Sequence, residues 1–496
     1  MGKTLTAPVP CPVSHWAKSA PDRLALTDGD RRISYRELDR MIDAARVSLQ
    51  RHDIRSGDVA AVLSRNSISY AVLLFAAFRS GVTLMPLNLR LNQSAWMSQM
   101  EKAHGRVVIV DAGYGALTFL SGVRSVRIDD IVSAEIPPRS HPPTAAYSLD
   151  AEALIIFSSG SAGPSRGVRL TWRNLYASAL GTASVIACDE SDCWLAVLPF
   201  YHVGGILIPF RTALAGCNAL IMDRFDPQAI IAAAAAGRLG YLSVVPTMLT
   251  EVISADASND LRHVKGIILG GAACPKRLRD EITARRLPVL TTYGMTETTS
   301  MVTLLPPADG PDKLHTAGKA LPYRELDIVD ALGEPVPPGQ PGRIMVRGEA
   351  VFSRYLDIPQ SPLTQDGWFD TGDDGLLDDE GYLTVIGRAD SVIMSGGEKI
   401  DLNEIERSIN MLDGVSGVVV MGIPDVKWGT RPVAFVELSD PQVTTRAFKE
   451  ALAPRLPKIM IPDHIVIVDR LPLTGTGKYD RQSLRSQYPD LWTRRN

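Results

Sequence analysis

The chain has 496 residues, of which 45% are apolar and 22% are charged, and its formal net charge is -3 at pH 7. These proportions are typical of globular proteins, and the small net charge gives no electrostatic basis for binding nucleic acid. The longest apolar run, residues 70–78, is too short to cross a bilayer, so we expect no membrane span.

The cysteines and the N-terminal residues indicate the cellular compartment in which we expect the protein. The chain has five cysteines, an odd number, with no CxxC pair, and residues 1–16 lack the apolar segment of a secretory signal. We therefore expect reduced thiols and a cytoplasmic location.

Up to about residue 300, short apolar runs alternate with longer amphipathic segments. The apolar runs lie at 58–64, 82–88, 106–111, 192–200, 218–223, 241–246 and 264–271, and segments of helical period lie at 69–80 and 227–240. Continuous apolar strands separated by helices predict layers of parallel sheet covered by helices.

The pattern then changes twice. Strand-like segments at 325–330, 342–348 and 381–388, separated by turn-rich pieces, predict a small β-rich module. From about residue 390, segments of helical period (402–412 and 445–456) alternate with strand-like ones (415–424, 432–438 and 463–472). The sequence therefore predicts an α/β fold. A large N-terminal domain over residues 1–389 contains the layered sheets and the β-rich module, and a small α+β domain covers residues 390–496.

The run SSGSAGPSRGV occupies residues 158–168 and follows the apolar ALIIF. We interpret it as a loop between a strand and a helix. Glycine-freed backbone amides, the serine hydroxyls and the Arg166 cation could together hold a polyphosphate. The glycines lack the spacing of a P-loop, and the run contains no lysine. Taken alone, such a loop is equally well a solvated connection.

Three further segments carry chemically useful side chains. TTYGMTETTS (291–300) places Tyr293, Thr296 and Glu297 at a strand end, where ligands bind in open α/β sheets. Tyr293 could stack on a purine, and Glu297 could hold Mg²⁺. GWFDTGDDG (367–375) and GRADSVIMSGGEKIDLNEIE (387–406) supply an aspartate and an arginine that could contact a ribose, and LPLTGTGKYDR (471–481) presents a lysine. Each of these segments, alone, also fits an ordinary polar turn.

In this order and with these gaps, the segments resemble the core motifs of the AMP-forming adenylating superfamily. That family comprises acyl- and aryl-CoA synthetases, peptide-synthetase adenylation domains and luciferases. RISYRELDR (32–40), LPFYHVGG (198–205) and GIPDVKWGTRPVAFV (422–436) are similar to further signatures of the family, so the resemblance covers nearly the whole chain. It implies attack of a carboxylate on the α-phosphorus of ATP, giving acyl-AMP and pyrophosphate, and then capture of the acyl group by a thiol.

The resemblance also implies residue roles, motif by motif. The loop residues Ser158, Ser159, Gly160, Ser161, Gly163 and Arg166 would hold the β- and γ-phosphates. Thr296 would contact the α-phosphate, Glu297 would hold Mg²⁺, Lys478 would bridge the carboxylate and the α-phosphate, and His202 would complete the catalytic set. Tyr293, Gly294, Gly271 and Ala272 would frame the adenine, Gly270 and Met295 the acid, and Asp373 and Arg388 the ribose.

Movement of the small domain is a further implication. Asp390 would be the hinge, and the domain would swing to withdraw Lys478 and to bring the face of Ser395, Gly396 and Gly397 towards the thiol. The ligands implied are a carboxylic acid, ATP, Mg²⁺ and coenzyme A as co-substrate. A carrier-protein thiol as the acceptor and a homodimer stay open.

The first motif departs from the family pattern. Ala162, Ser165 and Arg166 stand where the family usually has threonine, proline and lysine. A nucleotide- or acyl-AMP-binding protein with little turnover is therefore the alternative from a different class. We expect an enzyme, because the glutamate, aspartate, arginine and lysine of the other motifs are all present.

Arg211 bears on the identity of the acid. It interrupts the apolar segment 201–216, nine residues after His202, and an arginine that reaches solvent from a helix is the simpler interpretation. However, the chain resembles the 2-succinylbenzoate–CoA ligases of this superfamily in PTML, LGGAACP and SGGE. In some of them a basic residue at this spacing pairs with a second carboxylate of the substrate. A dianionic acid would neutralise a buried guanidinium, so we expect 2-succinylbenzoate, with an aryl or medium-chain monoacid as the alternative.

Overall fold

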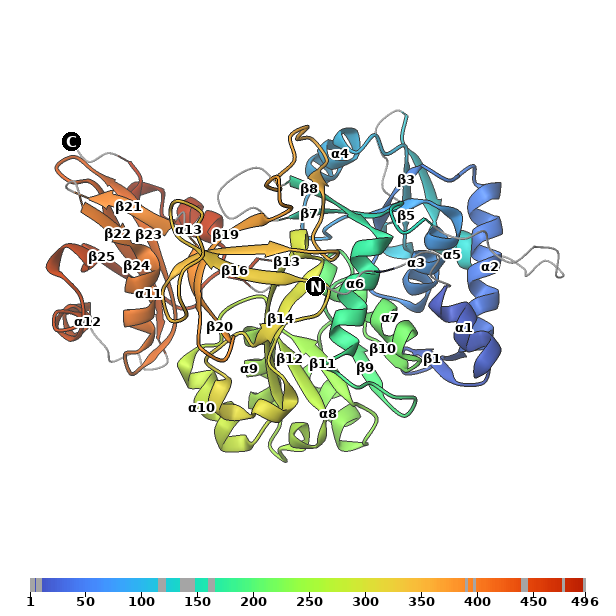
Figure 1. Cartoon of the computed structure of the whole chain (residues 1–496), viewed down its shortest axis with the longest axis horizontal. Helices are drawn as coiled ribbons and strands as arrows, with labels where there is room; N and C mark the ends of the chain where they lie inside the picture. Colours follow the sequence, from blue (N-terminus) through green and yellow to red (C-terminus); the bar gives the residue numbers. More distant parts are fainter. Residues whose placement is uncertain are drawn as a thin grey trace.

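The computed structural model describes residue 5 and residues 11–114, 122–133, 148–158, 166–388, 391–395, 398–438, 445–474 and 478–493. The molecule has a large body of layered sheets and helices, with a smaller domain formed by the C-terminal part of the chain at one end (Figure 1). Among the described residues, no helix combines the length and the apolar character needed to cross a membrane.

Two sheets form the layers of the large body. One runs in the order β18 (Arg354–Tyr355), β8 (Arg166–Thr171), β7 (Glu152–Ser158), β4 (Thr83–Pro86), β3 (Val59–Leu63), β5 (Val107–Val110), β6 (Arg124–Arg127). The other runs β15 (Lys319–Ala320), β14 (Ser300–Leu304), β13 (Val289–Met295), β12 (Gly266–Leu269), β11 (Tyr241–Val244), β9 (Cys193–Ala196), β10 (Asn218–Ile221), β1 (Leu24–Thr27), β2 (Arg32–Ser34). Both are parallel in their central parts, as the continuous apolar runs predict.

Helices fill the space between the two sheets and cover their outer faces. The inner helices are α3 (Ile68–Ser80), α6 (Trp172–Ala183) and α7 (Val203–Ala215). Helix α6 contacts β8 of one sheet and β14 of the other, and it packs along α7. The remaining helices of the large body are α1 (Pro12–Ser19), α2 (Tyr35–Arg51), α4 (Gln93–Lys102), α5 (Ile128–Val132), α8 (Pro227–Ala235), α9 (Pro246–Ala255) and α10 (Lys276–Arg285). The inner helices are buried on nearly every side, which is why their sequences are apolar all round.

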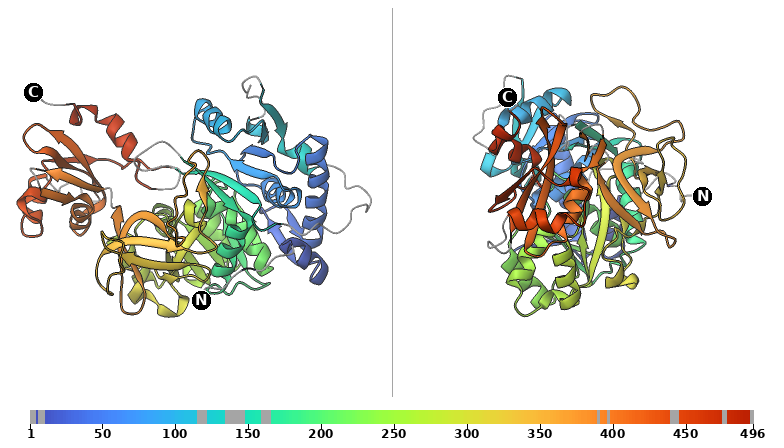
Figure 2. Two further views of the ribbon diagram at one scale, coloured as in Figure 1. Left: turned by 45° about the horizontal axis from the view of Figure 1, so that its top comes forward. Right: turned by 90° about the vertical axis from the view of Figure 1, so that its left-hand side faces the viewer.

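The predicted β-rich module is an antiparallel sheet in the order β16 (Glu325–Val329), β17 (Gly342–Arg347), β19 (Phe369–Leu377), β20 (Leu383–Arg388). The small domain contains β21 (Val392–Ser395), β22 (Glu398–Asp401), β23 (Val415–Asp425), β24 (Gly429–Leu438) and β25 (His464–Val468), with α11 (Leu402–Asn410), α12 (Thr445–Leu452) and α13 (Arg481–Gln487). It has an apolar core of its own, and Figure 2 shows it at one end of the molecule.

The structure confirms the predicted α/β fold, with a large N-terminal domain and a small α+β C-terminal domain. The boundary between residues 389 and 390 stays a prediction, because both residues lie outside the described part of the chain.

One local prediction is wrong. The glycine-rich run is followed by strand β8, not by a helix, and α6 begins only at Trp172. The reason is the alternation after the run: Val168 and Leu170 are buried, whereas Arg169 and Thr171 are half-buried, as in a strand. Strand β8 pairs antiparallel with β7, so the run connects two adjacent strands and does not precede a helix N-terminus.

Candidate functional site

The site residues of the large domain follow strands that end at one edge of a sheet. Strands β9, β11, β12 and β13 are parallel neighbours, so their carboxyl ends lie together. His202 caps α7 a few residues after β9, Gly270 follows β12 directly, and Tyr293 to Glu297 end β13 and begin the short helix η3 (Thr296–Thr298). The predicted strand-end location is therefore present in the fold.

A polar cluster connects this edge to the β-rich module. The Tyr293 hydroxyl donates to Asp373 Oδ2 at 2.6 Å, and Arg388 Nη1 lies 3.4 Å from Asp373 Oδ1. Asp373 and Arg388 are opposite each other on β19 and β20. Gly372 has a φ of +72°, and a side chain there would meet the Arg388 guanidinium at 2.9 Å. The three predicted adenosine-binding side chains are thus in contact with one another, on strands from two different sheets.

Glu297 is the most buried carboxylate of the cluster, with 6% of its surface exposed. The Tyr355 hydroxyl donates to its Oε1 at 3.2 Å. Burial raises the pKa of Glu297 above its ordinary value, and the Tyr355 hydrogen bond and the positive charges of Lys478 and Arg166 oppose that rise. A carboxylate in this setting favours a further cation, because burial without full compensation disfavours its charge.

The described donor set fits a magnesium ion held largely by phosphate oxygens. Mg²⁺ prefers oxygen ligands and is commonly bound by one or two carboxylates together with substrate phosphates and water. Glu297 supplies one carboxylate, and among the described residues no group of three or more acidic, histidine or cysteine side chains could form an all-protein metal site.

Of the predicted phosphate loop, two residues are described. Ser158 and Arg166 face each other at the ends of β7 and β8, and the Ser158 hydroxyl donates to the Arg166 carbonyl at 3.4 Å. The Arg166 guanidinium lies 5.4 Å from the centre of the Tyr355 ring. Ser159, Gly160, Ser161, Gly163 and the departures Ala162 and Ser165 lie outside the described residues.

The remaining predicted residues of the large domain lie in the same strand-end segments. Thr296 opens η3, and the Met295 amide donates to the Thr298 hydroxyl at 3.1 Å. Gly294 and Met295 pair with β14. Gly271 and Ala272 are exposed in the loop after β12, so their backbone is open to a ligand.

Lys478 belongs to the small domain. It is exposed, and it lies close enough to Glu297 for its charge to lower the pKa of that carboxyl. Arg90 of the large domain donates to the Thr474 carbonyl at 3.1 Å, in the segment that leads to Lys478, and it also hydrogen-bonds to Tyr201, the neighbour of His202.

The predicted hinge and thiol face are less fully described. Asp390, Gly396 and Gly397 lie outside the described residues. Ser395 is fully buried, and its hydroxyl accepts a hydrogen bond from Arg431 Nη1 at 3.3 Å. In this arrangement Ser395 is therefore covered by its own domain.

Arg211 lies in the interior, on α7, with 4% of its surface exposed. Its Nε and Nη2 atoms are buried and have no hydrogen-bond partner among the described residues. Burial lowers the pKa of Arg211 to about 9, so the side chain is still a cation at neutral pH. The structure thus excludes the simpler interpretation of a helix arginine that reaches solvent.

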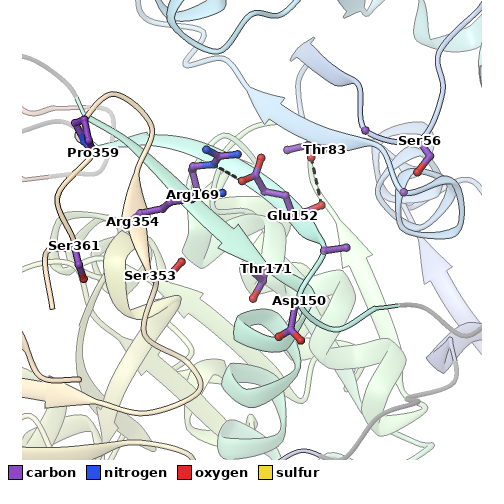
Figure 3. A pocket seen from close by; sticks show the side chains of 13 residues that line it. Ser56, Thr83, Asp150, Glu152, Arg169, Thr171, Ser353, Arg354, Pro359 and Ser361 are labelled. Atoms are coloured by element: carbon purple, nitrogen blue, oxygen red, sulfur yellow. Dashed lines mark hydrogen bonds and ion pairs between the residues drawn. The ribbon is translucent and has the colours of Figure 1, made fainter. Parts of the chain in front are cut away.

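A surface hollow of about 610 Å³ contains none of the predicted site residues. It is lined by residues of β7, β8 and the segments around 56–57, 81–83 and 353–361, and Arg169 pairs with Glu152 in it (Figure 3). Arg354 faces this hollow, whereas its neighbour Tyr355 contacts Glu297. Adjacent strand residues point to opposite faces, so the hollow and the cluster lie on opposite sides of β18.

Sequence reasoning missed three residues of the cluster. Tyr355 bridges Glu297 and Arg166, Arg90 contacts the segment that leads to Lys478, and Asn403 donates to the Arg388 carbonyl at 3.0 Å. Tyr355 follows a serine and an arginine in a segment without periodicity, and its one signal is an aromatic ring directly after a charged residue.

Family models and relatives agree with this geometry. The model of the AMP-binding enzyme matches residues 13–356, and the model of the AMP-binding enzyme C-terminal domain matches residues 404–478. A curated 2-succinylbenzoate–CoA ligase from Bacillus licheniformis is 31% identical over 94% of this chain and 98% of its own length.

Solved structures of relatives superimpose over almost the whole chain. O-succinylbenzoate coenzyme A synthetase (MenE) from Bacillus subtilis, in complex with ATP and magnesium ion, has a TM-score of 0.87 at 30% identity and covers 96% of this chain and 99% of its own. The same enzyme with the acyl-adenylate intermediate OSB-AMP has a TM-score of 0.85 at 30% identity and covers 96% of this chain and 98% of its own. ATP-bound MatB from Rhodopseudomonas palustris has a TM-score of 0.88 at 27% identity and covers 97% of this chain and 99% of its own.

Proposed function

Because this chain belongs to the AMP-binding enzyme family, we propose that it is an AMP-forming acid–CoA ligase that uses ATP and Mg²⁺. The observation that carries this proposal is the contact of Tyr293 and Arg388 with Asp373 at the strand-end edge that also holds the buried Glu297. A cation and a buried carboxylate beside an adenosine-type cluster suit a reaction that gathers negative charge on phosphoryl oxygens.

In the first half-reaction a carboxylate oxygen of the acid attacks the α-phosphorus of ATP, and the bond from that phosphorus to the pyrophosphate oxygen breaks. We assign Asp373, Arg388 and Tyr293 to hold the adenosine, so that the attacking and leaving oxygens are in line. Lys478 neutralises both the incoming carboxylate and the α-phosphate, and Arg166 faces the leaving pyrophosphate. A magnesium ion at Glu297 would neutralise charge on the phosphate oxygens.

In the second half-reaction the thiol sulfur of coenzyme A attacks the acyl carbonyl, and AMP leaves with the electron pair of the acyl–oxygen bond. We propose that residues 390–496 turn about Asp390 to withdraw Lys478 and to admit the thiol beside residues 395–397. The contacts that this turn must break include the hydrogen bond from Arg90 to the Thr474 carbonyl and the exposed ion pair of Arg470 with Glu251. The exposed ion pair is worth about 1 kcal/mol or less and the hydrogen bond from the charged Arg90 about 1.5–3 kcal/mol, so these two contacts oppose the turn by only a few kcal/mol.

The acid that we propose is 2-succinylbenzoate. Arg211 supports a substrate with a second carboxylate, because an unpaired buried guanidinium destabilises the protein until an anion neutralises it. The named relatives support the same acid. We also propose a cytoplasmic location, because the five cysteines form no disulfide. A homodimer is a further proposal, which rests on the resemblance.

The test is a panel of acids with ATP and either coenzyme A or a phosphopantetheinyl carrier protein, scored by AMP release. We expect 2-succinylbenzoate with coenzyme A to give the highest rate. Arg211→Ala should lower kcat/KM for this diacid by about 10-fold or more and leave 3-benzoylpropionate, which lacks the ring carboxylate, nearly unchanged.

Three outcomes would contradict the proposal. Equal loss of the diacid and the monoacid in Arg211→Ala would exclude the pairing. Faster transfer to the carrier protein would replace coenzyme A as the acceptor. ATP binding without acid-dependent pyrophosphate exchange would identify a binding protein rather than an enzyme.

A further inference from the structure

A second arginine is buried beside Arg211. Arg324 immediately precedes β16, and 6% of its surface is exposed. Its Nε and Nη2 atoms are buried and have no hydrogen-bond partner among the described residues, as is also true of Arg211. Arg324 lies against Gly181 of α6, and α6 packs along α7, the helix that carries Arg211. The two guanidinium groups are therefore buried in the same region of the interior, and the positive charge of Arg211 adds to burial in lowering the pKa of Arg324, to about 9.

No described carboxylate forms an ion pair with either group. Three buried hydroxyls on α6 and α7 donate to backbone carbonyls: Ser178 to Thr299, Thr182 to Ser178 and Thr212 to Pro209. The Nη1 atom of Arg324 donates to the Pro322 carbonyl at 3.2 Å, which leaves the rest of its donors without an acceptor. Two like charges at this depth repel each other and lack a counter-ion.

The chain makes room for Arg324 at a specific point of α6. A side-chain carbon at Gly181 would lie 2.7 Å from Arg324 Nη1 and 2.7 Å from the Pro322 carbonyl oxygen, so no larger residue fits there without displacing the guanidinium. Gly181 is in the last turn of α6, where the helix dipole favours a cation. The dipole offsets part of the cost of burying the Arg324 charge.

The position of the pair suits the far end of the acid. Helix α7 starts at the strand-end edge with His202 as its cap, and the nine residues from there to Arg211 advance about 13 Å along the helix. Helical side chains lean towards the N-terminus of their helix, so the Arg211 guanidinium can lie nearer to this edge than its backbone does. An acid whose reacting carboxylate lies at the edge can then direct a second carboxylate, carried on another part of the molecule, towards the arginines.

From these observations we infer that Arg324 is a second specificity residue, which binds the distal carboxylate of the acid together with Arg211. Two guanidinium groups offer several donors in fixed planes to one carboxylate. The inference rests on the proposed diacid and adds a residue to its recognition. The pair admits a dianionic acid and disfavours a monoacid, because a monoacid leaves two buried cations unneutralised.

The test compares Arg324→Met, Arg211→Met and the double variant in acid-dependent pyrophosphate exchange, with 2-succinylbenzoate and 3-benzoylpropionate as substrates. We expect Arg324→Met to raise KM for the diacid by about 10-fold or more, with little change in kcat and little change for the monoacid. Arg324→Lys keeps the charge and should recover part of the diacid preference. Arg347→Met is the matched control: it removes an arginine that is half-buried and paired with Glu325 of β16, and it should change the KM of neither acid.

The outcomes separate the two proposals. If the wild-type enzyme does not prefer the diacid, the proposed acid fails and this inference fails with it. If the wild type prefers the diacid and Arg211→Met abolishes that preference while Arg324→Met keeps it, the inference alone is overturned. Should Arg324→Met not fold, Gly181→Ala displaces the guanidinium without removing its charge. An unchanged KM for the diacid in that variant would equally overturn the inference.

Discussion

The two ends of the proposed active site differ in whether their charged side chains have partners within the protein. At the nucleotide end the protein supplies its own partners: Asp373 accepts a hydrogen bond from Tyr293 and pairs with Arg388. At the acid end Arg211 and Arg324 are buried without a carboxylate among the described residues. Since an unpaired buried charge destabilises a fold, the nucleotide end is organised before the substrate arrives, whereas the substrate completes the acid end.

The largest effect is expected from removing Lys478, because the nucleotide end then loses the cation that the small domain contributes. Lys478→Ala should lower adenylate formation by about 1000-fold, since the reacting carboxylate and the α-phosphate then repel each other. Thiolysis of a supplied acyl-adenylate should fall by less than about 10-fold, because that step proceeds with the lysine withdrawn. Pyrophosphate exchange and coenzyme A-dependent consumption of acyl-AMP measure the two steps separately, and equal losses would exclude the two-arrangement mechanism.

Glu297 is the exception at the nucleotide end, because its partners offset only part of the rise in pKa that burial causes. Glu297→Gln should lower adenylate formation by about 100-fold, because the magnesium ion loses its carboxylate. Without ligands the same variant should unfold at a higher temperature than the wild type at neutral pH. Burial raises the pKa of Glu297, so folding favours the protonated form and the ionised form destabilises the fold.

The pH dependence of that gain has a definite sign. As the pH rises from the ordinary carboxyl pKa through the raised pKa of Glu297, the unfolded state releases its proton first and the wild type loses stability. The advantage of Glu297→Gln should therefore be largest at neutral pH and smaller at about pH 5. Thermal unfolding in the two buffers measures it, and an advantage that grows as the pH falls would contradict the assigned cause.

The smallest effect is expected for the Tyr293 hydroxyl, which orients Asp373 without carrying charge. Tyr293→Phe should raise KM for ATP by about 5-fold and leave kcat nearly unchanged, because one hydrogen bond to a charged group is lost. Tyr241→Phe, which loses a hydroxyl contact to the Ala187 carbonyl in the same sheet, is the control and should keep the KM of the wild type. A lowered kcat with normal KM would move Tyr293 from binding the nucleotide to the chemical step.

Local patterns predicted most of this fold. The apolar runs became β3, β4, β5 and the strands from β9 to β12, because a buried parallel strand is recognisable from its own residues. Strand β8 was missed because the glycine-rich run before it suggested a helix N-terminus, whereas the alternation that decides the matter covers only a few residues.

The missed site residues depend on partners far away in the chain. Tyr355 matters because the fold brings it against Glu297, and Arg324 is buried because Gly181 leaves space for it. In the sequence, Arg324 is an ordinary charged residue before a short strand. Its burial comes from the packing of α6 against the sheets, which no local pattern encodes.

Arg90 has a consequence for how freely the loop of Lys478 can vary. The group that it contacts at Thr474 is a backbone carbonyl, which every residue type provides. Substitutions at position 474 therefore preserve the acceptor, whereas at position 90 a lysine would lose the planar fork that reaches both Thr474 and Tyr201. One side of the junction between the domains is thus tolerant of mutation and the other is not, so the loop can accumulate sequence changes while its docking point on the large domain stays the same.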